Sequence, residues 1–457
     1  MKPFWRQLIA ASPDYLKEHP CYDEIVATEG EDFLPIRIFG DDGALGKKRG
    51  ITLLHWAPIC SETRTTQLWK IPMCLFEKKF SLGDDTYNPV FEVLVWSLNQ
   101  ALYGLYPLSG HDGRSFHGRR GKLGGRRIMG KYRLVFLFWV CDWAYSASVF
   151  HLKHCYKFND ICHLCFATAA GANWFGRLDR CFPLRRHIDY MTSLAAAQSP
   201  LSQIIGFHTS CILPEMMHCG PLGVHLIVGG ACLYELCSSH HFGRFEEKRW
   251  DLKLDLQLAA AYRSFRAYCK HNHLKVCAPM FKKSKLSMKR TTSRPVLKYK
   301  AYAALVIVDW LAMICVEQAR ASTNEYVRAR ACLLSGLSRM FRVFREGGVF
   351  LDDAEVATLQ KALDAFVPAS YTLSMLSREE GRSHYHLIPK HHMIVHACRT
   401  AIRDRLNPGC YWTFSDEDMM RVIMTSSSAC SGLAVHKAGL ERWLLQFFGA
   451  YPLPCID

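Results

Sequence analysis

Two apolar runs that each end in aspartate constrain the fold of this chain more than any other feature. The first run covers residues 33–39 and is followed by Asp41 and Asp42. The second covers residues 134–141 and is followed by Asp142. A continuous apolar run of this length is typical of a strand buried on both faces of a sheet. We therefore expect a sheet that holds carboxylates at the ends of two strands, where side chains are positioned more rigidly than on a loop.

The segments between these runs predict further elements of the same core. Residues 51–56 and 68–80 have the composition of strands, and residues 90–105 carry apolar side chains at helical spacing. Three strands, a helix and a central strand, in that order, are typical of a ribonuclease-H-like fold. The predicted fold class is therefore α/β, with a ribonuclease-H-like mixed sheet as the core.

Beyond this core the pattern changes to long helical periods with no strand, which predicts a large all-α insertion. These patterns divide the chain into four segments. They are an N-terminal extension (1–31), the first part of the core (32–184), the helical insertion (185–404), and C-terminal helices with a third acid (405–457). A chain of 457 residues with 49% hydrophobic residues is long and apolar enough for such a core.

The formal charge of +16 and the pI near 9.1 indicate a polyanionic partner, and nucleic acid is the usual one. The basic residues concentrate at 110–133 and 275–300. Each segment is either a solvated loop or a surface that contacts a phosphate backbone. The candidate DNA-binding residues are Arg119, Arg120, Arg126, Arg127, Lys282, Lys283, Lys285, Lys289 and Arg290.

Cysteine usage indicates a reducing compartment. Residues 1–11 lack the apolar core of a signal peptide, so we expect the 20 cysteines to be reduced, with a few bound to metal. The apolar stretch 134–140 is too short to span a bilayer, and the stretch 302–316 contains Asp309. We therefore expect a cytosolic or nuclear protein with no membrane partner.

A split set of cysteines and histidines predicts a zinc site. Cys162 and Cys165 have the C-x2-C spacing of a zinc knuckle, and His392 and His396 share one face of a helix. His391 is an alternative to His392. A structural Zn2+ here would tie the first half of the core to the last insertion helix. The competing interpretation is a pair of core cysteines and a set of exposed histidines.

A late acidic residue completes a candidate carboxylate set. Glu417 lies in the segment 414–420, where a helix is expected to begin. Ordinary helix capping by Ser415, followed by acids in the first turn, also explains this segment. Together with Asp142 and either Asp41 or Asp42, Glu417 would give the oxygen ligands that two Mg2+ or Mn2+ ions need for phosphoryl transfer.

Two stretches carry a resemblance to a known family. Residues 138–165 resemble the segment of CACTA (En/Spm-like) transposases in which an aspartate closes a strand and a C-x2-C follows. Residues 389–420 resemble their later H-x3-H helix and the acid beyond it. The catalytic core of the V(D)J recombinase has a related arrangement. The resemblance implies catalytic and Mg2+-binding roles for Asp41, Asp142 and Glu417, and zinc ligation by Cys162, Cys165, His392 and His396.

The same resemblance implies a DDE-type enzyme of the nucleus that cleaves and joins double-stranded DNA at transposon ends and target sites. Water frees a 3′-hydroxyl, which then attacks the target DNA. The chain departs from the family at Glu215, which stands where a D-x-x-H element has aspartate before His218. Because only residues 1–31 precede the first strand, a degenerate copy is also expected. The alternative is a non-catalytic, transposon-derived DNA-binding or scaffold protein, and either form allows a homodimer.

Overall fold

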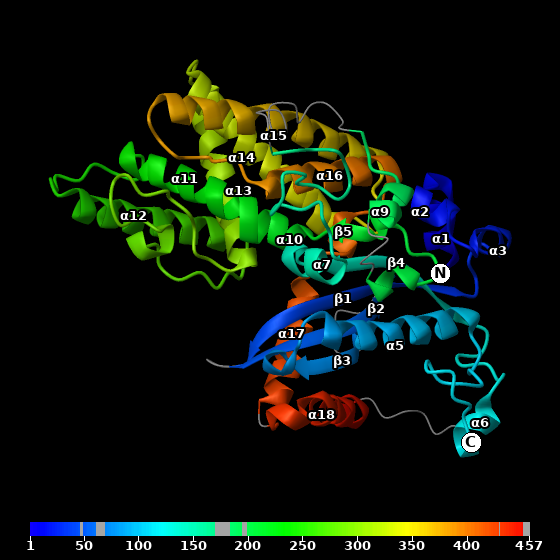
Figure 1. Cartoon of the computed structure of the whole chain (residues 1–457). Coiled ribbons are helices and arrows are strands. Elements are labelled where there is room, and N and C mark those ends of the chain that lie inside the picture. The colour runs from blue at the N-terminus through cyan, green and yellow to red at the C-terminus, as the bar shows by residue number, and fades with distance from the viewer. Residues whose placement is uncertain (46–48, 61–68, 170–182, 194–198, 429, 451–457) are drawn as a thin grey trace. The chain divides into compact units, whose positions relative to one another are not determined.

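The computed structural model describes residues 1–45, 49–60, 69–169, 183–193, 199–428 and 430–450. Within these ranges the chain is a mixed α/β protein with a five-stranded sheet (Figure 1). The chain divides into two compact units. The first comprises Met1–Ala167, Pro183–Glu215 and Cys410–Asp457, and the second comprises Thr168–Phe182 and Met216–Gly409.

The sheet lies in the first unit and has the strand order β3-β2-β1-β4-β5. β1 pairs antiparallel with β2 and parallel with β4, while β2–β3 is antiparallel and β4–β5 is parallel. The strands are β1 (Phe33–Leu45), β2 (Arg49–Pro58), β3 (Ile71–Glu77), β4 (Arg133–Cys141) and β5 (Ile212–Pro214). The expected strand at 68–80 is shorter than predicted, and residue 68 lies outside the described residues.

β1 is longer than the apolar run that predicted it. The segment Gly40–Gly43 was expected to close the strand, but it continues the antiparallel pairing, with Asp41 opposite Leu53 and Gly43 opposite Ile51. The pairing with β4 ends earlier, at Ile38 and Trp139, two residues before β4 itself ends at Cys141. The aspartates therefore lie where β1 passes the end of its parallel neighbour.

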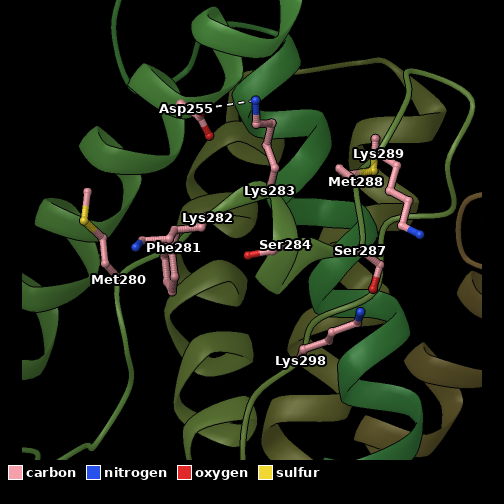
Figure 2. A pocket seen from close by; sticks show the side chains of 10 residues that line it. All are labelled: Asp255, Met280, Phe281, Lys282, Lys283, Ser284, Ser287, Met288, Lys289 and Lys298. Atoms are coloured by element: carbon pink, nitrogen blue, oxygen red, sulfur yellow. Dashed lines mark ion pairs between the residues drawn. The ribbon is translucent and has the colours of Figure 1, made fainter.

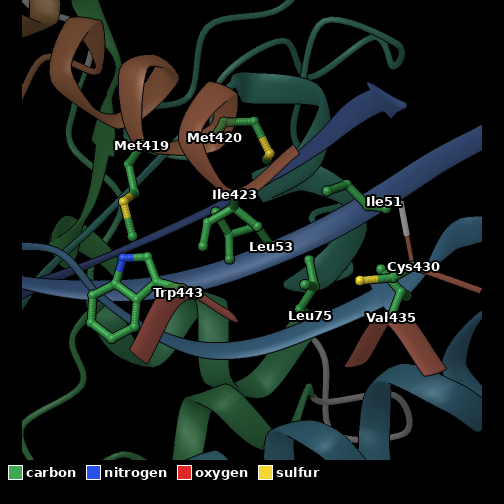
Figure 3. Packing of buried hydrophobic residues seen from close by; sticks show 9 residues of the cluster. All are labelled: Ile51, Leu53, Leu75, Met419, Met420, Ile423, Cys430, Val435 and Trp443. Atoms are coloured by element: carbon green, nitrogen blue, oxygen red, sulfur yellow. The ribbon is translucent and has the colours of Figure 1, made fainter. Parts of the chain in front are cut away.

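Helices cover both faces of the sheet. The helices α5 (Asp84–Tyr103) and α7 (Trp143–Val149) lie on one face, while α17 (Phe414–Ser427) and α18 (Val435–Ala450) lie on the other (Figure 1). Figure 3 shows the apolar cluster beneath α17 and α18. Because this cluster combines residues 51–75 with residues 419–443, the C-terminal helices belong to the core. Its members are Ile51, Leu53, Leu75, Met419, Met420, Ile423, Cys430, Val435 and Trp443.

The N-terminal residues are part of the folded unit. Trp5 is fully buried, and its indole Nε1 donates a hydrogen bond of 2.8 Å to the carbonyl oxygen of Phe33 at the start of β1. The burial of a large aromatic ring anchors the first helix to the sheet. The remaining shorter elements of this unit are α1 (Lys2–Ala11), α2 (Asp14–Lys17), α3 (Tyr22–Ala27), η1 (Lys78–Phe80), α6 (Gly118–Leu123), α9 (His187–Ser193), η2 (Pro200–Gln203), η3 (Thr209–Cys211) and η7 (Gly432–Ala434).

The basic segment 110–133 has a defined backbone. Phe116 N–H donates to Leu108 O at 2.9 Å, and Ile128 N–H donates to Gly104 O at 3.0 Å. These bonds fold the segment back on itself between α5 and β4. The candidate DNA-binding side chains of this segment are all exposed, namely Arg119, Arg120, Arg126 and Arg127.

The second unit is helical throughout its described residues. In α14, a Cβ at Gly336 would lie 2.7 Å from the carbonyl oxygen of Ala362, so α14 and α15 approach each other closely. The elements of this unit are α10 (Met216–Cys219), the π-helical turn η4 (Gly220–Val224), α11 (His225–Ser238), α12 (Trp250–His271), η5 (Lys283–Leu286), α13 (Ala301–Arg320), α14 (Glu325–Glu346), α15 (Asp353–Glu379) and α16 (Pro389–Asp404). A short turn, η6 (Pro408–Cys410), follows.

Two helical segments of this unit are long and apolar enough to cross a membrane, by length and composition alone. They are Met216–Ser238 and Ala301–Arg320, and 83% and 61% of their most apolar windows are buried inside the protein. Burial of this extent is typical of core helices. The carboxylate of Glu235 lies inside the first segment and accepts hydrogen bonds from the hydroxyls of Tyr326 at 2.5 Å and Tyr385 at 2.9 Å.

Candidate functional site

The parallel register of β1 and β4 leads to the same level for Asp41 and Asp142, three residues beyond the last pair. Ile38 is level with Trp139 in the parallel register. Three further residues along each strand bring Asp41 level with Asp142. Adjacent strands are about 4.8 Å apart, and residues at the same level of a parallel pair project from the same face. The two predicted strand-end carboxylates are therefore neighbours, although about 100 residues separate them in the sequence.

The face from which Asp41 projects is the one covered by α17, because Asp41 is paired opposite Leu53, which packs in one cluster with Met419 and Met420. Side chains alternate along a strand, so Phe138 and Val140 share a face of β4, and Asp142 directly follows that strand. The ring of Phe138 contacts that of Tyr411, just before α17, with a centroid distance of 5.9 Å. Asp142 also caps α7, because its Oδ1 accepts a hydrogen bond of 2.6 Å from the backbone N–H of Tyr145. Its second carboxylate oxygen is not needed for this cap.

Asp42 projects from the opposite face of β1, which separates the two candidates for the first acid. Its Oδ1 accepts a hydrogen bond of 2.6 Å from the Thr52 hydroxyl, and its Oδ2 forms an ion pair of 2.5 Å with Lys78. This is the face covered by α5, since Tyr87 of that helix lies 3.4 Å from Thr52 Oγ1. Asp41, which is paired opposite Leu53, projects from the other face of β1, toward α17.

Glu417 lies on the stripe of α17 that faces β1. A Cβ at Gly43 would come within 2.9 Å of the sulfur atoms of both Met420 and Met424, so this face of α17 packs closely on β1 at Gly43. Glu417, Met420 and Met424 follow the i, i+3, i+7 spacing of one helix face. Asp416, the residue before Glu417, contacts Arg37 of β1. Glu417 therefore lies over the part of β1 between Arg37 and Gly43, where Asp41 projects.

A buried ion cluster fixes the first turn of α17. The Asp416 carboxylate is fully buried and accepts hydrogen bonds from Arg37 Nη2 at 3.0 Å and from Lys70 Nζ at 2.6 Å. The His55 Nε2 atom lies 3.2 Å from Asp416 Oδ1. Charges of both signs thus meet in a buried site, where each needs its partner to offset the cost of desolvation.

The protonation states in this cluster follow from burial and charge. Burial alone would raise the pKa of Asp416, but the charges of Arg37 and Lys70, together with His55, outweigh it and hold the pKa well below its ordinary value. Burial lowers the pKa of His55 to about 4, so this imidazole is neutral at pH 7. Burial also lowers the pKa of Lys70 to about 8, although the adjacent Asp416 opposes this change.

The surroundings of the Cys141 thiol carry several negative charges. Its sulfur accepts a hydrogen bond of 3.0 Å from the Gly40 N–H, between the two strand ends. Burial raises the pKa of the Cys141 thiol well above its ordinary value, and the charges of Asp41, Asp142 and Asp416 act in the same direction. All three carboxylates are therefore close enough to Cys141 to affect the pKa of its thiol.

The C-x2-C pair forms a compact knuckle in the first unit. Cys162 and Cys165 are both fully buried, and the Leu164 N–H donates to Cys162 Sγ at 3.3 Å. Arg185 Nε donates to the carbonyl oxygen of Cys165 at 2.9 Å, and His163 Nε2 lies 3.0 Å from the carbonyl oxygen of Ile212 in β5. These contacts hold both sulfur atoms in place next to the sheet.

The histidine pair lies on α16. The Nε2 atoms of His392 and His396 are 3.1 Å apart, a spacing that a shared metal ion would explain. His392, and not the alternative His391, belongs to the group of possible metal ligands. The His391 ring stacks on Phe366, and its Nδ1 lies 3.2 Å from the carbonyl oxygen of Ile388. Burial lowers the pKa of His391 to about 3.

Cys162, Cys165, His392 and His396 form a buried group that could bind a metal ion such as Zn2+. Each residue offers one ligand atom, and these four atoms all lie within 4.8 Å of one another. In a tetrahedral site with bonds of about 2.0–2.3 Å, ligand atoms are roughly 3.3–3.8 Å apart. Two thiolates and two imidazoles are a donor set that zinc prefers, so the residues present fit this ion.

Several residues differ from their predicted roles. The helix α17 begins at Phe414 with Thr413 as its N-cap, so the capping role expected for Ser415 is wrong. Glu215 is buried, and its Oε1 accepts a hydrogen bond of 2.9 Å from the Thr413 N–H. Glu215 therefore positions the start of α17. His218 lies on α10 in the second unit.

The cluster around Asp416 was missed by the sequence analysis. Arg37 could have indicated this cluster, because it is a charged residue between two isoleucines in a strand that is otherwise apolar. A charged side chain at such a position is buried and requires a partner. The partner could not be identified because it lies almost at the other end of the chain, next to the more conspicuous Glu417.

Comparison of the sequence with models of protein families and with curated proteins finds no match.

Proposed function

We propose that this chain is a DDE-type transposase core that cleaves and transfers DNA strands, with Asp41, Asp142 and Glu417 as its metal-binding acids. The observation that supports this proposal is the parallel register of β1 and β4, whose last pair, Ile38 and Trp139, lies three residues before Asp41 and Asp142. When bound, two Mg2+ or Mn2+ ions would stabilise the charge on the entering and leaving oxygens of a phosphodiester. The three carboxylates would supply hard oxygen ligands for these ions.

The topology of the sheet supports a ribonuclease-H-like core. That fold has the strand order 3-2-1-4-5 with the second strand antiparallel to the others, and the described sheet has the same order and directions. In this interpretation the second unit is the insertion that separates β5 from α17. The basic surface at Arg119, Arg120, Arg126 and Arg127 would then bind the DNA backbone near the core, in a nuclear protein.

The zinc site has a structural role in this proposal. A zinc ion bound by Cys162, Cys165, His392 and His396 has four protein ligands and no open position, as in structural sites. It would hold the knuckle beside β5. The next residue after β5 is Glu215, whose side chain anchors the start of α17. Zinc would thereby stabilise the region that carries the third acid without taking part in the reaction.

The capping role of Asp142 favours a second candidate function. Because its Oδ1 already bonds to Tyr145 N–H, Asp142 has a structural reason to be present without any metal. A non-catalytic, transposon-derived DNA-binding or scaffold protein would keep the fold, the cap and the zinc site. The two candidates differ in whether the carboxylates bind divalent cations.

Substitution of Asp142 by asparagine separates these candidates. Asparagine is an equally good N-cap, so Asp142→Asn removes the negative charge while keeping α7 capped. We expect the wild-type chain to bind Mn2+ and to nick supercoiled plasmid DNA in the presence of Mg2+, and the Asp142→Asn chain to lose both properties. DNA binding without metal should be unchanged in both chains.

Asp42→Asn is the matched control, because it also removes one carboxylate, but from the face of β1 opposite to that of Asp41. The proposal predicts that Asp42→Asn retains Mn2+ binding, whereas Asp41→Asn and Glu417→Gln lose it. Absence of Mn2+ binding by the wild-type chain, with zinc and DNA binding intact, would favour the scaffold.

A further inference from the structure

The second unit carries a lysine-rich hollow that the proposed nuclease core does not use. It has a volume of about 760 Å³, and the connection between α12 and α13 forms most of its wall. Figure 2 shows the lining, which consists of four lysines, two serines, one aspartate and three apolar residues. Small-molecule sites in proteins have volumes of about 300–1,000 Å³, so this hollow is large enough for a ligand rather than a single ion.

The lysines project from a backbone that is held in place. The side chains of Phe281, Leu286 and Leu297 are at most 2% exposed and anchor the connection to the helices. The two arms of the connection are also bonded to each other. Val296 N–H donates to Leu286 O at 3.1 Å, and Lys298 N–H donates to Lys285 O at 2.8 Å. Residues 275–300, which were predicted to be a solvated linker or a DNA contact, therefore have a backbone that is held in place by hydrogen bonds and buried side chains.

Most of the positive charge in the hollow is not neutralised by the residues that the structure describes. Lys283 forms an ion pair of 3.0 Å with Asp255, which Figure 2 marks with a dashed line. Lys282, Lys289 and Lys298 are exposed, and none of them forms an ion pair with any residue that the structure describes. Four cations thus face one carboxylate, and such an excess attracts an anion.

We propose that this hollow binds the oligophosphate group of a nucleotide. A lysine amine acts as a flexible point charge for phosphate, whereas carboxylates are recognised more often by the planar fork of arginine. Ser284 adds a hydroxyl beside the lysines, and hydroxyls donate to phosphate oxygens. Three lysines that form no ion pair with the described residues favour a ligand with more than one charge, because a single monoanion would leave most of the excess in place.

The apolar side of the hollow suits the rest of a nucleotide. Met280 is 45% exposed, next to the buried ring of Phe281. A flat base could cover this thioether while the phosphates lie among the lysines. A free nucleoside triphosphate carries directly linked phosphates and fits this proposal. The phosphodiesters of a DNA strand are spaced by sugars and are the competing ligand that the duplex tests. The inference does not depend on the nuclease proposal, since all of these residues belong to the second unit.

Binding of defined probes to the full chain tests this proposal. The probes are dATP, inorganic tripolyphosphate and a 20-base-pair DNA duplex, titrated by calorimetry at 150 mM salt without added divalent metal. The variant combines Lys282→Ala with Lys298→Ala, two exposed side chains whose loss should not affect folding. The matched control combines Lys270→Ala with Lys361→Ala, which removes the same charge from exposed positions outside the hollow. Thermal unfolding verifies that both variants are folded.

We expect the pocket variant to bind at least one probe about tenfold more weakly than wild type, and the control to change by less than twofold. Weaker binding of dATP and tripolyphosphate alone would identify a free nucleotide as the ligand. Weaker binding of the duplex would identify a DNA strand. Equal losses in the pocket and control variants, or unchanged binding of all three probes, would overturn the proposal. Neither result would bear on Asp142, which is tested through Mn2+ binding.

Discussion

Arg37 and Asp416 form a buried ion pair across 379 positions of sequence, with Arg37 Nη2 3.0 Å from Asp416 Oδ2. The pair joins the centre of β1 to the first turn of α17. Lys70 adds a second cation at 2.6 Å, so the carboxylate has a partner on both of its oxygens. The position of the adjacent Glu417 depends on this pair, because Asp416 fixes the end of the helix from which Glu417 projects.

We expect Asp416→Asn to destabilise the protein by about 3–5 kcal/mol. The substitution leaves Arg37 and Lys70 buried without an anion, and an uncompensated buried charge carries a large desolvation cost. Chemical denaturation monitored by tryptophan fluorescence measures the change. The matched control is Asp418→Asn, which removes an exposed carboxylate two residues along the same helix and should cost less than about 1 kcal/mol. Equal effects of the two substitutions would contradict the role of the cluster.

The main strands were predictable because their residues are apolar on both faces. β4 was predicted at 134–140 and spans Arg133–Cys141, which a run of buried residues specifies well. β5 was missed, because three residues are too few to show any periodicity. Its position is set by pairing with β4, a tertiary contact that a local pattern does not contain.

The candidate site was predictable in part for a similar reason. The spacing of Cys162 to Cys165 and of His392 to His396 is local, so each pair could be found without the fold. The resemblance implied Asp41 over Asp42, whereas the residues alone left both open. The alternation of β1 and the helix that covers each face separate the two. Asp416 and Arg37 could not be paired from sequence, since nothing local connects a charge in a strand with an acid near the C-terminus.

The N-cap at Asp142 predicts a difference between two substitutions at one position. Asp142→Ala should destabilise the protein by about 1 kcal/mol, because the Tyr145 N–H loses its acceptor. Asp142→Asn should leave stability within about 0.5 kcal/mol of wild type, since asparagine caps equally well. Thermal unfolding without divalent metal measures both values. A similar loss in the two variants would mean that the carboxylate charge, rather than the cap, stabilises this position.

The zinc site predicts one equivalent of Zn2+ in the purified chain, as measured by elemental analysis. Cys165→Ser should remove the metal and lower the melting temperature by several degrees, because a structural zinc ion contributes directly to folding. The control is Cys277→Ser, at a free and exposed cysteine. It should retain both the metal and the stability. Less than about 0.1 equivalent of zinc in protein produced with added zinc would contradict the assignment.

Acidification should weaken the fold through His55. Its pKa is about 4 in the folded protein, below the ordinary value of about 6.5 that applies after unfolding. Between these values the unfolded chain binds a proton that the folded chain does not, so stability falls as the pH decreases from 6.5 to 4. Asp416 stays ionised and Lys70 stays protonated over this range, because their pKa values lie below and above it.

The contribution of His55 can be isolated by comparing variants at two pH values. In His55→Gln, the loss of unfolding free energy between pH 7.0 and pH 4.5 should be about 2 kcal/mol smaller than in wild type. The remaining histidines titrate in both chains and therefore cancel in the difference. His436→Gln, at an exposed position, should show the wild-type loss. If His55→Gln also showed the full wild-type loss, His55 would have to be protonated in the folded protein, and its contact with Asp416 would then be a charged pair.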